Sequence, residues 1–170
     1  FITTKNAGHV VKYKTNIFGW ITSIEGVKIR YSYLLNKGTA FTLPGIAIYA
    51  NPSLHYNLQL FMHEFGHVLQ AYQWGSAYFY EVVGPTSMRN YKKYKGNWTI
   101  YDRTWTEWSA NKLSYLYFGE PAWDPIKYPL SPGSSHIETF SPDSDGPGDF
   151  LINWIDGENH PKGLNKYYSY

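Results

Sequence analysis

The chain has 170 residues and a hydrophobic fraction of 43%, which predicts one globular domain over residues 1–170 rather than a disordered segment. Its formal net charge is +2 and its basic residues form no broad face, so nucleic-acid binding is not supported. It has no cysteine, which excludes a disulfide scaffold and a thiolate metal site, and it has no apolar run near the roughly 20 residues of a membrane-spanning helix.

The first third of the chain is expected to form a small antiparallel sheet. Short runs of β-branched and aromatic residues occupy positions 9–14, 17–24 and 27–35, and glycine-containing turns separate them. A further short strand is expected at residues 46–50, after a Pro-Gly pair and before an Asn-Pro pair that breaks the chain.

Two helices are predicted after the strands. The first spans residues 58–74, with Gly75 as its C-terminal cap, and the second spans residues 105–118, between Thr104 as N-cap and Gly119. The apolar positions of the first helix recur at three- and four-residue spacing, which predicts one buried stripe: Phe61, Phe65, Val68, Leu69 and Tyr72.

The other segments have weaker patterns. Residues 77–83 fit either a strand or a helix, and residues 84–103 are expected to be irregular, with the basic stretch at 89–95 in a solvated surface loop. Proline and glycine dominate after the second helix, so residues 119–149 are expected to be rich in loops. Residues 150–155 could pack on the core, and residues 161–170 are expected to be a frayed tail.

Residues 63–67 read HEFGH and match the pattern H-E-x-x-H inside the first predicted helix. Because residues four apart on a helix share one face, His63 and His67 can bind the same Zn²⁺. The carboxylate of Glu64 can then reach a water on the metal, as the general base of a hydrolase does. The motif therefore predicts one zinc ion per chain, and the alternative is a pair of ordinary surface histidines.

A catalytic zinc usually has three protein ligands and one open position, so a third ligand is needed. Glu107 on the second predicted helix is the best candidate, and Asn111, one turn later, could accept a hydrogen bond from a ligand imidazole. The alternative is that Glu107 forms a capping box with Thr104 at the start of the helix. Other downstream candidates for the third ligand are acidic residues and one histidine: Glu81, Asp102, Glu120, Asp124 and His136.

HEFGH followed by TEWSAN resembles the gluzincin branch of zinc metallopeptidases, and HEFGHVLQAYQWG with WTEWSAN is similar to small, poorly characterised bacterial zincin-like proteins. The resemblance covers about residues 44–119. It implies a zincin-like α+β domain, in which a small antiparallel sheet packs on a zinc-binding helix and a second helix carries the Glu ligand. Asn111 departs from the Asp that is usual there. The metzincin pattern fails, because Gln70 and Gln73 stand at its Gly and third His positions.

The resemblance also implies a strand, just upstream of the zinc helix, that pairs with an extended substrate. The candidate positions are Ile46, Ala47, Ile48, Tyr49 and Ala50, and the alternative is an ordinary core or edge strand. A side chain that stabilises the oxyanion of the tetrahedral intermediate is expected as well. The spacing does not select one among His136, His160 and the tyrosines.

These patterns predict a zinc-dependent peptidase that acts on a peptide or protein substrate. Zn²⁺ held by His63, His67 and Glu107 would activate a water, and Glu64 would take its proton and pass it to the leaving amine. The alternatives are a zincin-scaffold binding module without turnover and a zinc amidase with a non-protein substrate. Because the sequence opens at Phe1 without a methionine, we expect a processed or trimmed chain, and a secreted or extracytoplasmic location is slightly favoured.

Overall fold

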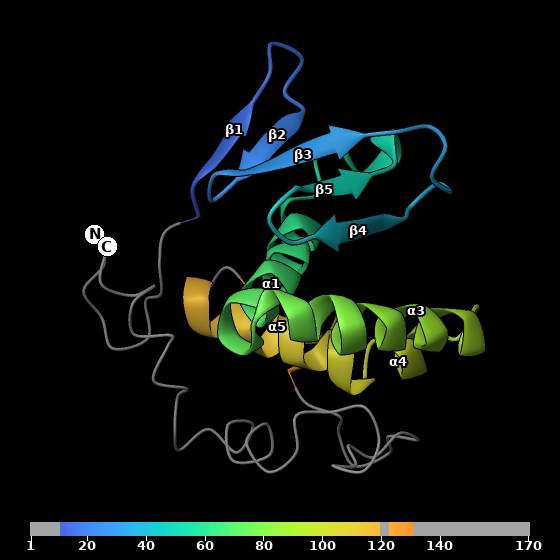
Figure 1. The fold of residues 1–170 in the computed structure, drawn as a ribbon. Coiled ribbons are helices and arrows are strands. Elements are labelled where there is room, and N and C mark those ends of the chain that lie inside the picture. The colour runs from blue at the N-terminus through green and yellow to red at the C-terminus, as the bar shows by residue number, and fades with distance from the viewer. Residues whose placement is uncertain (1–10, 120–122, 131–170) are drawn as a thin grey trace.

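The computed structural model describes residues 11–119 and 123–130. A five-stranded sheet lies over a group of helices (Figure 1), so the predicted α+β class is confirmed. The strands are β1 (Tyr13–Thr15), β2 (Ile21–Ile24), β3 (Val27–Tyr31), β4 (Ala40–Leu43) and β5 (Ala47–Ala50). The helical segments are η1 (Pro52–Leu54), α1 (Leu58–Trp74), α2 (Ser76–Tyr78), η2 (Phe79–Val83), α3 (Gly84–Lys93), α4 (Trp98–Tyr101) and α5 (Trp105–Phe118).

The sheet has the order β1-β2-β3-β5-β4 and is mixed rather than antiparallel throughout. β3 and β5 run parallel, while the other three neighbouring pairs are antiparallel. Since β5 lies between β3 and β4, both of its hydrogen-bonding edges are occupied. The prediction that residues 46–50 pair with a substrate is therefore wrong, because no edge of that strand remains for a peptide. The edge strand on this side of the sheet, next to β5, is β4.

The strand predicted at residues 17–24 begins later, at Ile21, because the preceding residues form a tight turn. The side chain of Asn16 accepts hydrogen bonds from the backbone amides of Phe18 and Trp20, at 2.9 and 3.0 Å. Gly19 adopts a φ of 80°, which a residue with a side chain rarely adopts. Ile17 and Phe18 consequently lie at the tip of a hairpin rather than in a strand.

The bounds of α1 and α5 agree with the predicted helices, and Gly75 and Gly119 follow them as predicted. The apolar stripe of α1 is buried except for Tyr72, which is 61% exposed. Residues 76–93 and 98–101 are helical, so the expectation of an irregular segment at 84–103 is largely wrong. Pro85 lies in the first turn of α3, where proline is tolerated, and does not break the helix.

The basic stretch also belongs to a helix rather than to a loop. Lys92 and Lys93 lie in the last turn of α3, where positive charge interacts favourably with the helix dipole. No helix within residues 11–119 and 123–130 is long and apolar enough to cross a membrane. The predicted run at 150–155 and the tail at 161–170 lie outside the described residues, as does most of the segment expected to be loop-rich.

α1 and α5 cross at a point where their backbones touch. A β-carbon built on Gly66 would lie 2.2 Å from the carbonyl oxygen of Ala110, so only glycine fits at this position. One turn away on each helix, the hydroxyl of Ser114 donates a hydrogen bond of 2.6 Å to the carbonyl oxygen of Met62. This contact holds the HEFGH segment of α1 directly against the first half of α5.

We predict that Gly66→Ala lowers the free energy of unfolding by about 1–3 kcal/mol, because the added methyl group forces the helices apart. Thermal or denaturant unfolding measures the change. Gly84→Ala is the matched control, since Gly84 is also helical but its nearest neighbour would be 3.4 Å away. The control should be neutral or more stable by up to about 1 kcal/mol, as expected from helix propensity. If Gly66→Ala and Gly84→Ala changed the free energy of unfolding equally, the close approach of α1 and α5 at Gly66 would not be the cause.

Candidate metal centre

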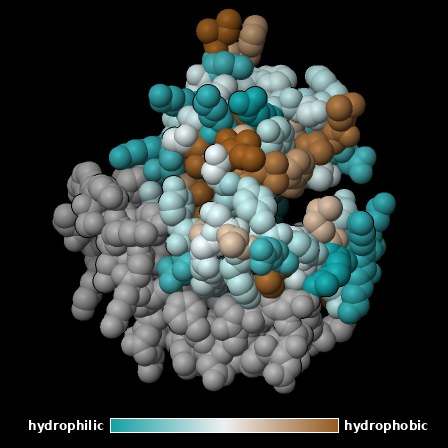
Figure 2. Space-filling view, viewed as in Figure 1, coloured by the Kyte–Doolittle hydropathy of each residue, from teal (hydrophilic) through white to brown (hydrophobic). Residues whose placement is uncertain are grey.

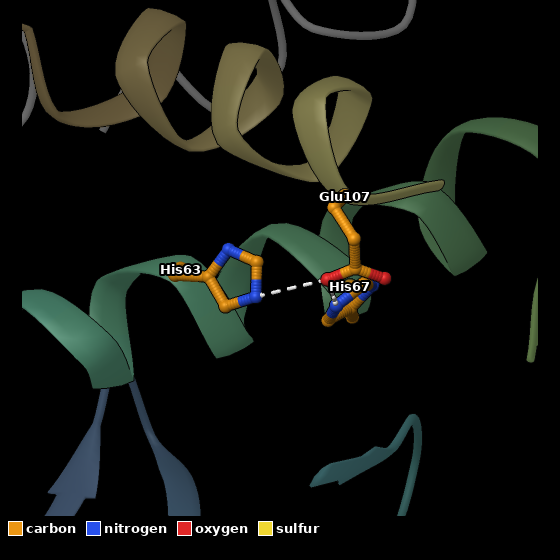
Figure 3. A group of neighbouring side chains, drawn as sticks. All are labelled: His63, His67 and Glu107. Carbon is orange, nitrogen blue, oxygen red and sulfur yellow. Dashed lines mark ion pairs between the residues drawn. The ribbon is translucent and has the colours of Figure 1, made fainter. Parts of the chain in front are cut away.

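Three side chains from α1 and α5 meet in the interior (Figure 3). The Nε2 atoms of His63 and His67 lie 3.4 and 3.5 Å from Oε2 of Glu107, and all three ligand atoms fall within 4.8 Å of one another. Within the described part of the chain, this is the one group of three or more His, Cys, Asp or Glu residues close enough to hold a metal ion. The structure thus brings together the three residues that the sequence selected as ligands.

Two of the three spacings in this group are compatible with tetrahedral coordination of one metal ion. Two ligands with bonds near 2.1 Å at a tetrahedral angle are about 3.4 Å apart, close to both nitrogen–oxygen distances. Imidazole and carboxylate donors suit zinc and several other divalent transition metals. The side chain of Glu107 keeps 3% of its surface in contact with solvent, whereas those of His63 and His67 keep 11% and 10%.

The orientation of His63 is fixed by Asn111. Nδ1 of His63 lies 2.6 Å from Oδ1 of Asn111, which is the hydrogen bond expected from the sequence. The amide nitrogen of Asn111 donates to the carbonyl oxygen of Pro129 at 2.9 Å, so its oxygen faces the imidazole. An amide oxygen only accepts, and Nδ1 therefore carries the proton. Nε2 is therefore the nitrogen that a metal would bind, in place of any proton there.

His67 is held in the same way by Gln70, a residue that the sequence analysis did not select. Nδ1 of His67 lies 2.8 Å from Oε1 of Gln70, whose amide nitrogen donates to the carbonyl oxygen of Thr106 and to Ser109. Nδ1 is thus the protonated nitrogen of this ring too. The signal was available, because Gln70 is one helical turn after His67 and shares its face. Such partners are typical of metal-binding histidines.

Glu107 is not a helix cap. The side chain of Thr104 makes no capping hydrogen bond and instead donates to the carbonyl oxygen of Tyr101 at 2.7 Å, so the capping-box alternative fails. Ser87 donates to Oε1 of Glu107 at 2.6 Å, and Thr106 also contacts this oxygen, at 3.2 Å. Because the single proton of Ser87 is used there, the hydroxyl of Tyr101 donates to Ser87. Oε2 remains for the two imidazoles.

The three groups are strongly coupled when no metal is bound. Burial lowers the pKa of His63, but its hydrogen bond to Glu107 and the charges of Glu64 and Glu107 raise it to about 9. Burial also lowers the pKa of His67, but the charge of Glu107 outweighs this effect and raises the pKa above its usual value. Burial raises the pKa of Glu107, but the charges of His67 and His63 and their hydrogen bonds hold it well below its usual value.

Glu64 lies next to the metal-binding group but does not belong to it. The hydroxyl of Thr42 in β4 lies 2.6 Å from Oε2 of Glu64 and 3.1 Å from its backbone carbonyl oxygen. Both residues are buried, at 7% and 4% exposure. The contact links β4 to α1 and fixes Oε2 of the carboxylate. No local pattern in the sequence marks Thr42 for this position.

The other predicted candidates that the structure describes do not belong to the group of three. Glu81 is exposed, Asp124 caps a turn through the amides of Ile126 and Lys127, and neither belongs to the group of three. Asp102 also lies outside the group, and burial raises its pKa to about 6. Among the tyrosines, Tyr128 stacks on His63 with ring centres 5.7 Å apart. Glu120, His136 and His160 lie outside the described residues.

Comparison of the chain with family models, curated proteins and solved structures finds no match. The interpretation of the site therefore depends on its geometry and chemistry.

We predict that Glu107→Ala weakens zinc binding by more than the roughly 10–100-fold typical of losing an outer partner of a ligand. Glu107→Gln keeps the size of the side chain and one oxygen but not the charge, so it should weaken zinc binding less than Glu107→Ala does. Titration with a chromophoric zinc chelator measures both. Glu81→Ala, a change at an exposed glutamate, should leave the affinity unchanged. Unaltered zinc affinity in Glu107→Ala would move the third ligand to another residue.

We also predict that zinc binding at pH 7 releases between one and two protons per chain, about one of them from His63. Its pKa near 9 means that the metal-free imidazole is protonated at pH 7, and the metal must displace that proton. The affinity should therefore fall as the pH is lowered. Calorimetry in buffers of different ionisation enthalpy counts the protons. Zinc binding without proton release would contradict the coupling of the two histidines to Glu107.

Proposed function

We propose that this chain is a zinc-dependent peptidase with a zincin-like fold of the gluzincin type. The observation that carries the proposal is the convergence of three donor atoms, Nε2 of His63, Nε2 of His67 and Oε2 of Glu107. Every other polar atom of the two imidazoles and the carboxylate has a protein partner. A site whose three remaining donor atoms all face one point is more specific for a metal than a cluster of titratable side chains.

Zinc held by these residues would supply Lewis-acid chemistry, acidifying water and polarising a peptide carbonyl. Glu64 is the proton carrier in this proposal. Oε2 of Glu64 is held by Thr42, which leaves Oε1 to accept a proton from water and to return it to the leaving amine. The side chain is 4% exposed, so the carboxylate cannot swing freely between several positions in solvent.

We place the substrate along β4, the edge strand that packs against α1. Within residues 11–119 and 123–130, β4 pairs with another strand only on the side of β5. A peptide in extended conformation can add to the other edge through backbone hydrogen bonds. The same strand contributes Thr42, whose side chain reaches Glu64. A peptide paired with β4 would therefore lie beside the proton carrier as well as the metal ligands. This arrangement favours a peptide over a small molecule as substrate.

The proposal predicts that Glu64→Gln abolishes hydrolysis but keeps zinc. Glutamine preserves the size of the side chain and can accept the hydrogen bond of Thr42, but it cannot take a proton. The rate should fall by at least the roughly 10²–10⁴-fold typical of losing general acid–base catalysis. Digestion of an unbiased peptide library by the zinc-loaded chain first identifies a substrate, on which the variant is then assayed.

The matched control is Glu81→Gln, the same chemical change at an exposed glutamate. It should retain full activity and full zinc content. Loss of zinc in Glu64→Gln would make Glu64 a ligand and the assignment of roles wrong. If the unaltered, zinc-loaded chain cleaves nothing in a broad library, the peptidase proposal fails and a binding module or an amidase with a non-protein substrate takes its place.

A further inference from the structure

Two loops at one end of the sheet present large apolar side chains to solvent. The hairpin tip between β1 and β2 exposes 93% of Ile17 and 71% of Phe18, and the loop between β3 and β4 exposes 84% of Tyr33 and 97% of Leu34. Apolar colour appears over both loops in Figure 2, at the top and at the upper right of the view. Consecutive apolar residues that are largely exposed on two neighbouring tips indicate a binding surface.

The first tip is rigid. Besides the two hydrogen bonds that Asn16 accepts through its side chain, the backbone amide of Asn16 donates to the carbonyl oxygen of Trp20 at 3.0 Å. The hydroxyl of Tyr56 braces the tip from outside the hairpin by donating to the carbonyl oxygen of Phe18 at 3.1 Å. The exposure of Ile17 and Phe18 is therefore built into the turn.

The second tip is braced as well. Oγ of Ser32 accepts a hydrogen bond from the amide of Leu34 at 3.2 Å, and the side chain of Asn51 donates to the carbonyl oxygen of Leu35 at 2.8 Å. The amide of Gly38 donates to Ser53 at 3.0 Å, which ties the far end of the loop to η1. Two stiff loops thus hold apolar side chains away from the protein, and a partner would find them already in position.

An open hollow of about 440 Å³ separates the tips. Trp20, which follows the first tip, and Tyr33 of the second tip form part of its wall, together with Lys37 and His55. The rings of Trp20 and His55 are 4.9 Å apart. Within the described residues, no ion pair is formed by Lys37. The hollow therefore combines aromatic walls with a cation at its rim, which suits a ligand that is anionic at one end.

The charge of this part of the chain is strongly one-sided. Between residues 11 and 56 the only acidic residue is Glu25, whose carboxylate accepts from the amide of Lys12 and from Tyr117. The basic side chains of the same segment are all exposed: Lys12, Lys14, Lys28, Arg30 and Lys37. Lys14 lies three residues before Ile17 and Lys37 lies three residues after Leu34, so each tip has a cation beside it.

We propose that this end of the sheet docks on the surface of an anionic lipid bilayer. Ile17, Phe18 and Leu34 would enter the boundary between headgroups and acyl chains, and Lys14 and Lys37 would contact lipid phosphates. A bilayer is favoured over a protein partner because the tips protrude on either side of a hollow. A folded partner would need two cavities at matching positions, whereas lipids close around any protrusion. This proposal does not depend on the peptidase proposal or on zinc.

The test is co-sedimentation of the full 170-residue chain with vesicles. Vesicles of phosphatidylcholine with phosphatidylserine should bind the chain, and vesicles of phosphatidylcholine alone should bind it at least tenfold more weakly. Phe18→Ser combined with Leu34→Ser should lower the partition coefficient roughly tenfold or more. Lys14→Gln combined with Lys37→Gln should also lower the partition coefficient roughly tenfold or more. Raised salt should likewise weaken binding of the unaltered chain to anionic vesicles.

Ile126→Ser is the matched control, because Ile126 is 91% exposed but lies after α5, away from the tips. It should change binding less than twofold. Circular dichroism of each variant checks that the fold is intact, which is expected for exposed positions. Three results would overturn the proposal: no binding to anionic vesicles, equal binding to neutral ones, or binding that survives both double substitutions. A dimer in light scattering that the apolar double substitution disrupts would also overturn it, in favour of a second copy of the chain.

Discussion

The contact between the backbones of Gly66 and Ala110 determines where the candidate metal centre can form. The two histidines come from α1 and the glutamate from α5, so their mutual distances follow directly from the separation of the helices. Hydrogen bonds between the helices flank the contact: His63 donates to Asn111, and Gln70 donates to Ser109. A metal site tolerates errors of only a few tenths of an ångström in ligand distance, and a crossing without side chains between the backbones meets that demand.

The interior around the site is polar, which is costly unless each group has a partner. Glutamine, asparagine, serine and threonine side chains surround the two imidazoles and the carboxylate, and each makes a hydrogen bond that orients its neighbour. Apolar residues of similar volume would stabilise such a helix pair at least as well. The arrangement is therefore better explained by a function than by stability, since it directs three lone pairs to one point.

Local patterns in the sequence were sufficient for the parts of the site that lie on single helices. HEFGH gave the histidine pair and Glu64, and the spacing within the second helix gave Glu107 and Asn111. Thr42 and Ser87 could not be predicted, because each reaches the site from an element distant in sequence. The pattern of residues 84–103 also predicts an irregular segment rather than the helix on which Ser87 lies. The sheet was predicted less well for the same reason. Alternation of apolar residues identifies strands, but the insertion of β5 between β3 and β4 depends on contacts that no local pattern records.

The backbone contact at Gly66 also restricts the motif itself. In the general pattern H-E-x-x-H the two middle positions are free, and either accepts a bulky side chain on an isolated helix. In this architecture the second of them faces a carbonyl oxygen 2.2 Å from where its β-carbon would be, so the pattern narrows to H-E-x-G-H. The partner helix adds three further positions to the pattern: Glu at the candidate ligand position, a small residue three positions later and Asn directly after it. A genome search for chains that share this architecture would need this longer string, which combines the chemistry of the ligands with the shape of the helix crossing.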